Sequence, residues 1–247
     1  MRTVMQFLLV VLALASTGVH AQTVPVRGEI TSRPVREFSA RGVPMLDALL
    51  QLGRETDVPL GIEYIDLHAL RQPVSVALRD TTFGQVLDSI LQYGQGYAWS
   101  TQNGVALIRN QKLPLAPSLN LFEFVIGKYT LPRPATLAEA SMLLYMELDV
   151  RIHGTKGFAG SYNPGDVRRK IDPLRLTNKT VGEILNTILG NRKHAAWIAT
   201  APPEKLGNLQ ASGLWRIVEY SDPMRSYASE LGQLPQFQYD FLNWKLD

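Results

Sequence analysis

The sequence predicts an α+β protein made of two tandem βαβ-βαβ-type modules whose helices pack on small sheets. Three observations predict this class: an internal repeat, helical periodicity that follows Thr-based capping signals, and short alternating strands. The chain has 247 residues, of which 45% are hydrophobic and 19% charged, a composition typical of a folded chain. It contains no cysteine, which excludes disulfides, a Cys-based zinc site and a thiol nucleophile.

Residues 1–21 have the layout of a secretory signal peptide. Arg2 supplies a positive charge, residues 7–15 are an unbroken apolar run, and Val19 and Ala21 place small side chains before a cleavage site. A helix of nine residues spans about 14 Å, roughly half the apolar core of a bilayer. We therefore expect cleavage after Ala21, no stable membrane insertion of the mature chain, and a periplasmic or secreted location.

The internal repeat is the clearest pattern in the rest of the chain. Residues 78–99 and 176–197 align without a gap at an offset of 98 positions, and eight of the 22 pairs are identical. Average composition predicts about one or two identities by chance. Residues 47–48 match residues 139–140 at an offset of 92, so the repeat extends upstream and predicts one fold for both copies.

Two helices are expected in the first copy. Pro44 favours a first helical turn, because the N–H that proline lacks has no partner there. Residues 45–52 then place apolar side chains at helical spacing along one face. Thr82 and Gln85 form a capping box in front of a second amphipathic helix.

The strands of the first copy are expected around these helices. Residues 59–64 are strand-like, and residues 74–79 alternate between apolar and polar side chains as a half-buried strand does. Asn103-Gly104 is a strong two-residue turn signal, so we expect a hairpin between strands at 97–101 and 105–109.

The second copy repeats this order of elements. The segments Thr136–Glu139 and Thr180–Glu183 each carry a capping box at the start of an apolar helical stripe. Residues 121–126 (LFEFVI) are expected to open the copy as a strand. Strands containing Trp197 and residues 214–220 are expected in place of the tight hairpin.

These patterns divide the chain into six segments. In chain order they are a signal peptide (1–21), an N-terminal extension (22–35), a first module (36–109), a linker (110–120), a second module (121–220) with a loop insertion at 154–170, and an aromatic C-terminal tail (221–247).

Two sequence stretches carry a resemblance to a known family. Residues 43–50 read VPMLDALL, and residues 78–91 read LRDTTFGQVLDSIL. With the strand and hairpin signals around them, they resemble the short N-terminal domain of secretins and TonB-dependent receptors, the STN family. The resemblance covers residues 36–109 well and residues 121–220 more weakly. Its motifs are core positions, so it bears on fold more than on activity.

The resemblance implies a periplasmic, non-catalytic docking unit. In the STN family the module precedes an outer-membrane secretin pore or a TonB-dependent barrel. Only residues 221–247 follow the second copy here, so we expect neither a secretin nor a receptor. The resemblance implies an envelope protein as the partner without identifying it.

The sequence contains no recognisable catalytic or metal motif. His20, His68, His153 and His194 do not stand at metal-ligand spacing. Glycine motifs for phosphates or dinucleotides are missing as well. The sequence therefore predicts no enzyme, no cofactor and no metal. The longest basic run, residues 168–170, and the nearly balanced charge do not favour nucleic acid as a partner.

The C-terminal tail is the candidate partner-docking site. Phe237, Tyr239 and Phe241 alternate with polar residues and Trp244 follows, which places three aromatic rings on one face of a strand. Such a strand either packs back on its own module or adds to a sheet of another protein. The Gly-rich residues 154–169 are a second candidate contact surface.

Trp99 and Trp197 occupy equivalent positions of the repeat. They are either core caps or an aromatic platform for a ligand, and their repetition favours the core.

The sequence thus predicts a non-catalytic periplasmic protein-interaction or assembly module of an envelope secretion, pilus or TonB-type system. Two alternatives stay open. One is a periplasmic hydrolase that uses acidic residues from the interface between the modules. The other is a small-molecule sensor domain.

Overall fold

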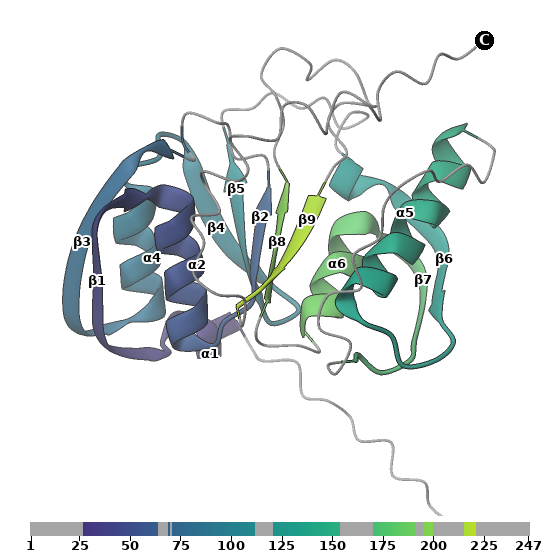
Figure 1. The fold of residues 1–247 in the computed structure, drawn as a ribbon, viewed down its shortest axis with the longest axis horizontal. Coiled ribbons are helices and arrows are strands. Elements are labelled where there is room, and N and C mark those ends of the chain that lie inside the picture. The colour runs from purple at the N-terminus through teal and green to yellow at the C-terminus, as the bar shows by residue number, and fades with distance from the viewer. Residues whose placement is uncertain are drawn as a thin grey trace, which may run out of the picture.

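The structure is a computed structural model that describes residues 27–63, 69, 71–111, 121–153, 170–190, 195–199 and 215–220. The described elements lie in five layers (Figure 1). A central five-stranded sheet has a pair of helices on each side, and each helix pair is covered by a two-stranded sheet. The predicted α+β class is confirmed.

The first copy begins with a short helix and an outer strand, and the predicted helices and strands follow them in order. Its elements are α1 (Arg27–Thr31), β1 (Pro34–Pro44), α2 (Met45–Thr56), β2 (Leu60–Glu63), β3 (Pro73–Thr82), α4 (Phe83–Leu91), β4 (Tyr97–Gln102) and β5 (Val105–Asn110). Strands β1 and β3 pair antiparallel as an outer sheet. The turn between β4 and β5 has positive φ angles at Asn103 and Gly104, as the two-residue hairpin signal predicts.

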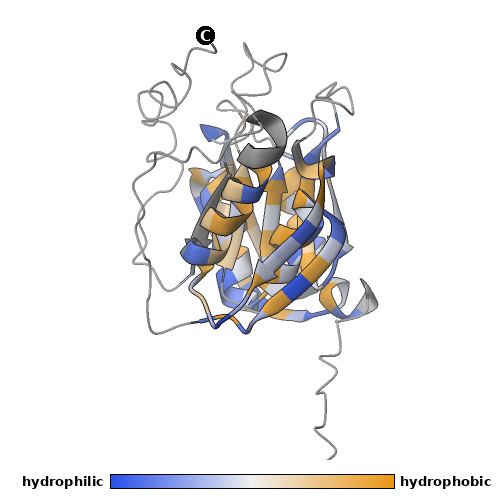
Figure 2. Cartoon of the chain, turned by 90° about the vertical axis from the view of Figure 1, so that its right-hand side faces the viewer, coloured by the Kyte–Doolittle hydropathy of each residue, from blue (hydrophilic) through white to orange (hydrophobic). Residues whose placement is uncertain are grey.

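The second copy has the same succession of outer strands, helices and hairpin strands. Its elements are η2 (Leu121–Glu123), β6 (Val125–Leu131), α5 (Leu137–His153), β7 (Leu174–Thr180), α6 (Val181–Gly190), β8 (Ala195–Ala199) and β9 (Trp215–Glu219). Strands β6 and β7 form the other outer sheet. Figure 2 faces this side and shows hydrophilic and hydrophobic residues alternating along its strands.

The strand predicted for residues 121–126 is wrong in its first half. Residues 121–123 form a single 3-10 turn, and the strand begins only at Val125. The reason is the side chain of Phe122, which is buried and stacks on Trp197 with 4.9 Å between the ring centroids. A turn directs this ring toward the core, whereas a strand would continue along the outer sheet.

The two copies also differ at the end of their first helix. Asp57 ends α2 in the left-handed conformation, whereas the aligned Asp149 lies inside α5, which continues to His153. At the offset of 92, residues 55–58 also match residues 147–150 in sequence, but this match does not extend to conformation. The linker residues 112–120 and the insertion residues 154–169 lie outside the described residues.

The central sheet is shared between the copies. Its strand order is β4-β5-β2-β8-β9, with β2 parallel to both β5 and β8. The first copy supplies β4, β5 and β2, and the second copy supplies β8 and β9. The sequence predicts small sheets within each module, and the structure joins strands of both modules across the β2–β8 pair.

Each face of the central sheet belongs to one hydrophobic core. Leu60, Ile62 and Ile198 face α2 and α4, whereas Leu107 and Trp197 face α5 and α6. Because each core contains residues of both copies, burying either one requires the other copy to be in place. The repeat residues Leu87 and Leu185 are both fully buried, so the apolar stripes serve the cores as predicted.

All three predicted capping boxes are present. Thr82, Thr136 and Thr180 each accept a hydrogen bond from a backbone N–H three residues later, at 3.4, 3.1 and 3.1 Å. The Gln85, Glu139 and Glu183 side chains accept in return from the N–H of the respective threonine. Thr180 thus fixes the start of α6, which carries part of the second core.

Substitution of Thr180 by alanine is expected to lower the free energy of unfolding by about 1 kcal/mol, because the first turn of α6 loses its capping acceptor. Thermal or urea unfolding of the purified chain measures the loss. Thr180→Ser keeps the hydroxyl and is the control. An equal loss in both variants would contradict the capping explanation.

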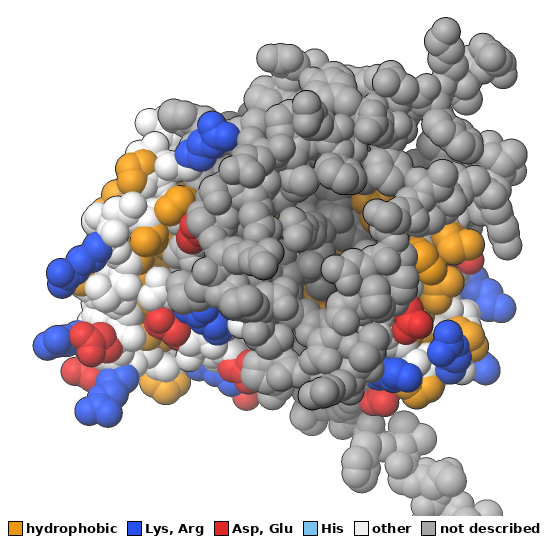
Figure 3. All heavy atoms as spheres, viewed as in Figure 1, with side chains coloured by type: hydrophobic (Ala, Val, Ile, Leu, Met, Phe, Trp, Pro, Cys, Tyr) orange, Lys and Arg blue, Asp and Glu red, His pale blue; other side chains and the backbone are white. Residues whose placement is uncertain are grey.

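The surface has a mixed charge where the structure describes it. On the side of β1 and β3, basic and acidic side chains lie close together (Figure 3). Arg79 and Glu37 form an exposed ion pair there at 3.1 Å. Among the described helices, none has the length and apolar character needed to cross a bilayer.

Candidate functional site

The residues that the sequence singled out for docking are not placed by the structure. Phe237, Tyr239, Phe241 and Trp244 lie outside the described residues, as does the Gly-rich segment 154–169. Their role stays a prediction. The described residues direct attention to the two equivalent tryptophans instead.

Trp99 and Trp197 are held in the same way in the two copies. The indole N–H of Trp99 donates to Asp88 Oδ1 at 2.7 Å, and that of Trp197 donates to Asn186 Oδ1 at 2.8 Å. Asp88 and Asn186 stand on α4 and α6 at the same repeat offset as the tryptophans. The repeat therefore conserves a polar contact as well as apolar packing.

The surroundings of the two tryptophans differ sharply. Trp197 and Asn186 are completely buried, whereas Trp99 is half-buried and Asp88 is exposed. The ring of Trp99 meets Phe83 edge-on, with 5.9 Å between the ring centroids. In the second copy the tryptophan is a core cap, as the repeat favours. In the first copy part of the ring stays accessible.

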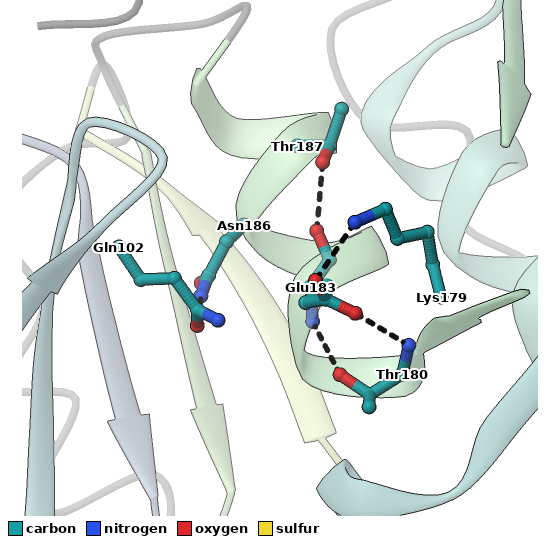
Figure 4. Close-up of polar contacts among 6 residues, drawn as sticks. All are labelled: Gln102, Lys179, Thr180, Glu183, Asn186 and Thr187. Carbon is teal, nitrogen blue, oxygen red and sulfur yellow. Dashed lines mark hydrogen bonds and ion pairs between the residues drawn. The ribbon is translucent and has the colours of Figure 1, made fainter.

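The first copy is what covers the second. Gly61 on β2 pairs with Trp197 on β8, and a Cβ built at Gly61 would lie 2.7 Å from the indole ring. Asn186 donates from Nδ2 to Gln102 Oε1 at 2.7 Å (Figure 4). The indole ring of Trp197 thus lies over β2 at Gly61, where the strand has no side chain.

The equivalent position on the first copy is open among the described residues. On the side away from β9, β8 pairs with β2. The corresponding side of β4, away from β5, has no described strand beside it. Every residue of β8 is buried, whereas every residue of β4 is half-buried. Another strand can add to a sheet edge that, like this one, is not covered by any of the described strands.

A depression of about 470 Å³ lies beside this edge. Asp88, Gln92, Tyr97 and Trp99 contribute to its lining. We call β4 together with this depression the β4 site. It combines an aromatic surface, a carboxylate and a sheet edge that none of the described strands covers.

The contact between α6 and the first copy depends on a small residue. A Cβ at Gly190 would lie 2.8 Å from the backbone oxygen of Asn103 in the β4–β5 turn. Gln92, the repeat equivalent of Gly190, is exposed and lines the depression. A side chain is therefore tolerated where the covering copy is absent.

Gly190→Ala is expected to destabilise the chain by about 1–3 kcal/mol, because the Asn103 carbonyl must move away from the helix. Gln92→Ala at the equivalent position is the control and is expected to change stability by less than about 0.5 kcal/mol. Urea unfolding monitored by circular dichroism measures both. If the two variants behave alike, the packing of α6 on the hairpin turn is not a stabilising contact.

A second polar group lies where the copies meet. Glu63 ends β2, is 3% exposed, and pairs with Arg109 on β5, with 2.8 Å between Oε2 and Nε. Arg109 also reaches Glu123 of the second copy at 3.6 Å. The arginine therefore links a buried carboxylate of one copy to an exposed carboxylate of the other.

Burial raises the pKa of Glu63 to about 7. The positive charge of Arg109 lowers this pKa, but the loss of water on burial outweighs it, and the negative charge of Glu123 raises the pKa further. The Oε1 atom of Glu63 has no hydrogen-bond partner among the residues that the structure describes. A carboxyl group in this state changes its charge near neutral pH.

The described residues contain no cluster of three or more His, Cys, Asp or Glu side chains able to hold a metal ion. His20, His68 and His194 lie outside the described part of the chain. Comparison of the chain with family models, curated proteins and solved structures finds no match.

The sequence held signals for both features that the structure adds. Asp88 is replaced by Asn186 in the second copy, eleven positions before a tryptophan that both copies share. Glu63 is the only charged residue in the strand-like stretch 59–64. Neither signal reveals burial, because burial depends on which strands of the other copy lie alongside.

Proposed function

We propose that the chain is a non-catalytic protein-interaction module of the cell envelope that binds a partner at the β4 site. It would serve a secretion, pilus or TonB-type system, from the periplasm. The observation that carries this proposal is the contrast between equivalent edges. β8 is covered by β2, whereas the edge of β4 is without a described neighbour.

The sequence supports the same reading. The signal peptide layout favours the periplasm, and the resemblance to the STN family favours docking over catalysis. The open edge lies next to the half-buried ring of Trp99. Aromatic rings are enriched in protein interfaces because they bury a large area at a low entropic cost.

A small-molecule sensor is the second candidate, and one observation favours it. The volume of the depression, about 470 Å³, falls within the range of small-ligand pockets. A ligand-dependent rise of the melting temperature in a metabolite screen, lost in Trp99→Ala, would support this role. The hydrolase alternative has one buried carboxylate at the interface in its favour, that of Glu63.

The test of the proposed function is photo-crosslinking in the cells that produce the chain. A photoreactive residue replaces Thr101 on β4, and in a second variant it replaces Ser39 on β1. Ser39 is exposed and lies on an outer strand that also pairs on one side only among the described strands. The two variants therefore present comparable strand edges.

The proposal expects a crosslinked envelope protein, identified by mass spectrometry, from position 101 and not from position 39. Adding Trp99→Ala to the position-101 variant should reduce the crosslink at least fivefold. The absence of any crosslink at position 101, or equal yields at both positions, would overturn the proposed function.

A further inference from the structure

We infer that the partner of the β4 site inserts an extended strand parallel to β4, with glycine opposite Trp99. This inference rests on the proposed function and adds the chemistry of the partner. It follows from the repeat, because the second copy displays the same site in its occupied form.

The first step is the equivalence of the edges. β8 follows α6, carries Trp197 and pairs with β9, as β4 follows α4, carries Trp99 and pairs with β5. The remaining edge of β8 receives β2 in parallel, with Gly61 opposite Trp197 and Ile62 opposite Ile198. Transferred to β4, this register places glycine opposite Trp99 and the following residue opposite Ser100.

The second step is the demand for glycine. The ring of Trp197 lies so close to β2 that a Cβ at residue 61 would stand 2.7 Å from it, which no real contact allows. The bond from Trp99 to Asp88, 2.7 Å long, repeats the bond that orients Trp197. Asp88 is thus a positioning residue, and the inference places the added strand against the accessible part of the half-buried Trp99 ring.

The third step identifies what kind of chain can occupy the site. A second copy of this protein cannot offer β2, because β2 is already paired on both sides with β5 and β8. No other glycine in the sequence stands between two apolar residues, so no other segment of this chain fits the site and the occupant is a segment of a different protein. Its pattern is apolar-Gly-apolar, after Leu60-Gly61-Ile62, whose two apolar residues are fully buried.

Disulfide trapping tests this inference on the full mature chain, which contains no cysteine of its own. Ser100→Cys places one thiol on β4. The probe is a peptide with the sequence of residues 58–64 and cysteine in place of Ile62, which falls opposite position 100 in the expected register. The competing peptide also has valine in place of Gly61. Ser39→Cys on β1 is the control chain.

The inference expects at least a tenfold higher yield of mixed disulfide for the glycine peptide than for the valine peptide, measured at equilibrium in a glutathione buffer. Trp99→Ala should remove this preference, and Ser39→Cys should show none. Moving the peptide cysteine to the Leu60 position should lower the yield, because this shifts the register.

Equal yields for both peptides on Ser100→Cys overturn the inference, as does an equal preference on Ser39→Cys. If the full chain forms a dimer that Trp99→Ala dissociates in sedimentation experiments, a second copy is the occupant and the inference is wrong. A crosslink from position 101 in cells without a glycine preference in trapping leaves the proposed function standing and removes only this inference.

Discussion

Replacing Trp197 by alanine is expected to lower the free energy of unfolding by about 4 kcal/mol, because a fully buried aromatic ring leaves a cavity that its neighbours cannot fill. The ring stacks on Phe122 and lies against Gly61 of the first copy. Its loss also leaves Asn186 without the indole donor in a fully buried position. Urea unfolding followed by circular dichroism measures the effect.

Trp99→Ala is the internal control, because Trp99 and its hydrogen bond to α4 are the equivalents of Trp197 and its hydrogen bond to α6. The half-buried ring of Trp99 is expected to contribute about 2 kcal/mol. The difference between the two variants reports the contribution of the covering copy. Equal losses would mean that β2 adds nothing to the packing of Trp197, and the comparison of occupied and open sites would fail.

Glu63→Gln is expected to make the chain more stable at pH 8 and to leave it almost unchanged at pH 4.5. The pKa of Glu63 is about 7 in the folded chain against 4.5 for the free group. Folding therefore takes up a proton between these values, and stability falls as the pH rises from 4.5 to 7. A shift of this size corresponds to a loss of roughly 3 kcal/mol in the free energy of unfolding as the pH rises. The wild type shows this loss, and the variant does not.

The measurement is urea unfolding of both chains at several values between pH 4.5 and pH 8. Arg109 and Glu123 are the charged groups that face Glu63, and both are retained in the variant. Glu37→Gln on the surface pair with Arg79 is the control and should show no such pH dependence. A stability difference between wild type and Glu63→Gln that does not vary with pH would show that the carboxyl is ionised throughout.

The sequence was sufficient for features that depend on local order. The capping boxes, the turn at Asn103 and the buried stripes with Leu87 and Leu185 are encoded within a few residues of one another, and the structure confirms them. The alignment of Trp99 with Trp197 also predicted that the two side chains occupy equivalent positions in the two copies. These features follow from periodicity and from hydrogen bonds to neighbouring backbone groups.

The sequence was not sufficient for contacts between distant segments. Residues 60–62 and 196–198 pair across the centre of the sheet, and no local pattern specifies that register. For the same reason the burial of Glu63 and the covered state of Asn186 could not be predicted. The turn at Phe122 was missed because its ring packs on a tryptophan 75 positions later.

The shared sheet has a consequence for biosynthesis. The ribosome releases β2 long before it has made β8. Until the second half is made, the nascent first half therefore exposes the edge of β2 that later pairs with β8. Folding intermediates with bare edges of this kind are prone to misassembly. A gene fragment that ends after the first copy should therefore yield an insoluble product, and folding of the whole chain should improve with holding chaperones during synthesis.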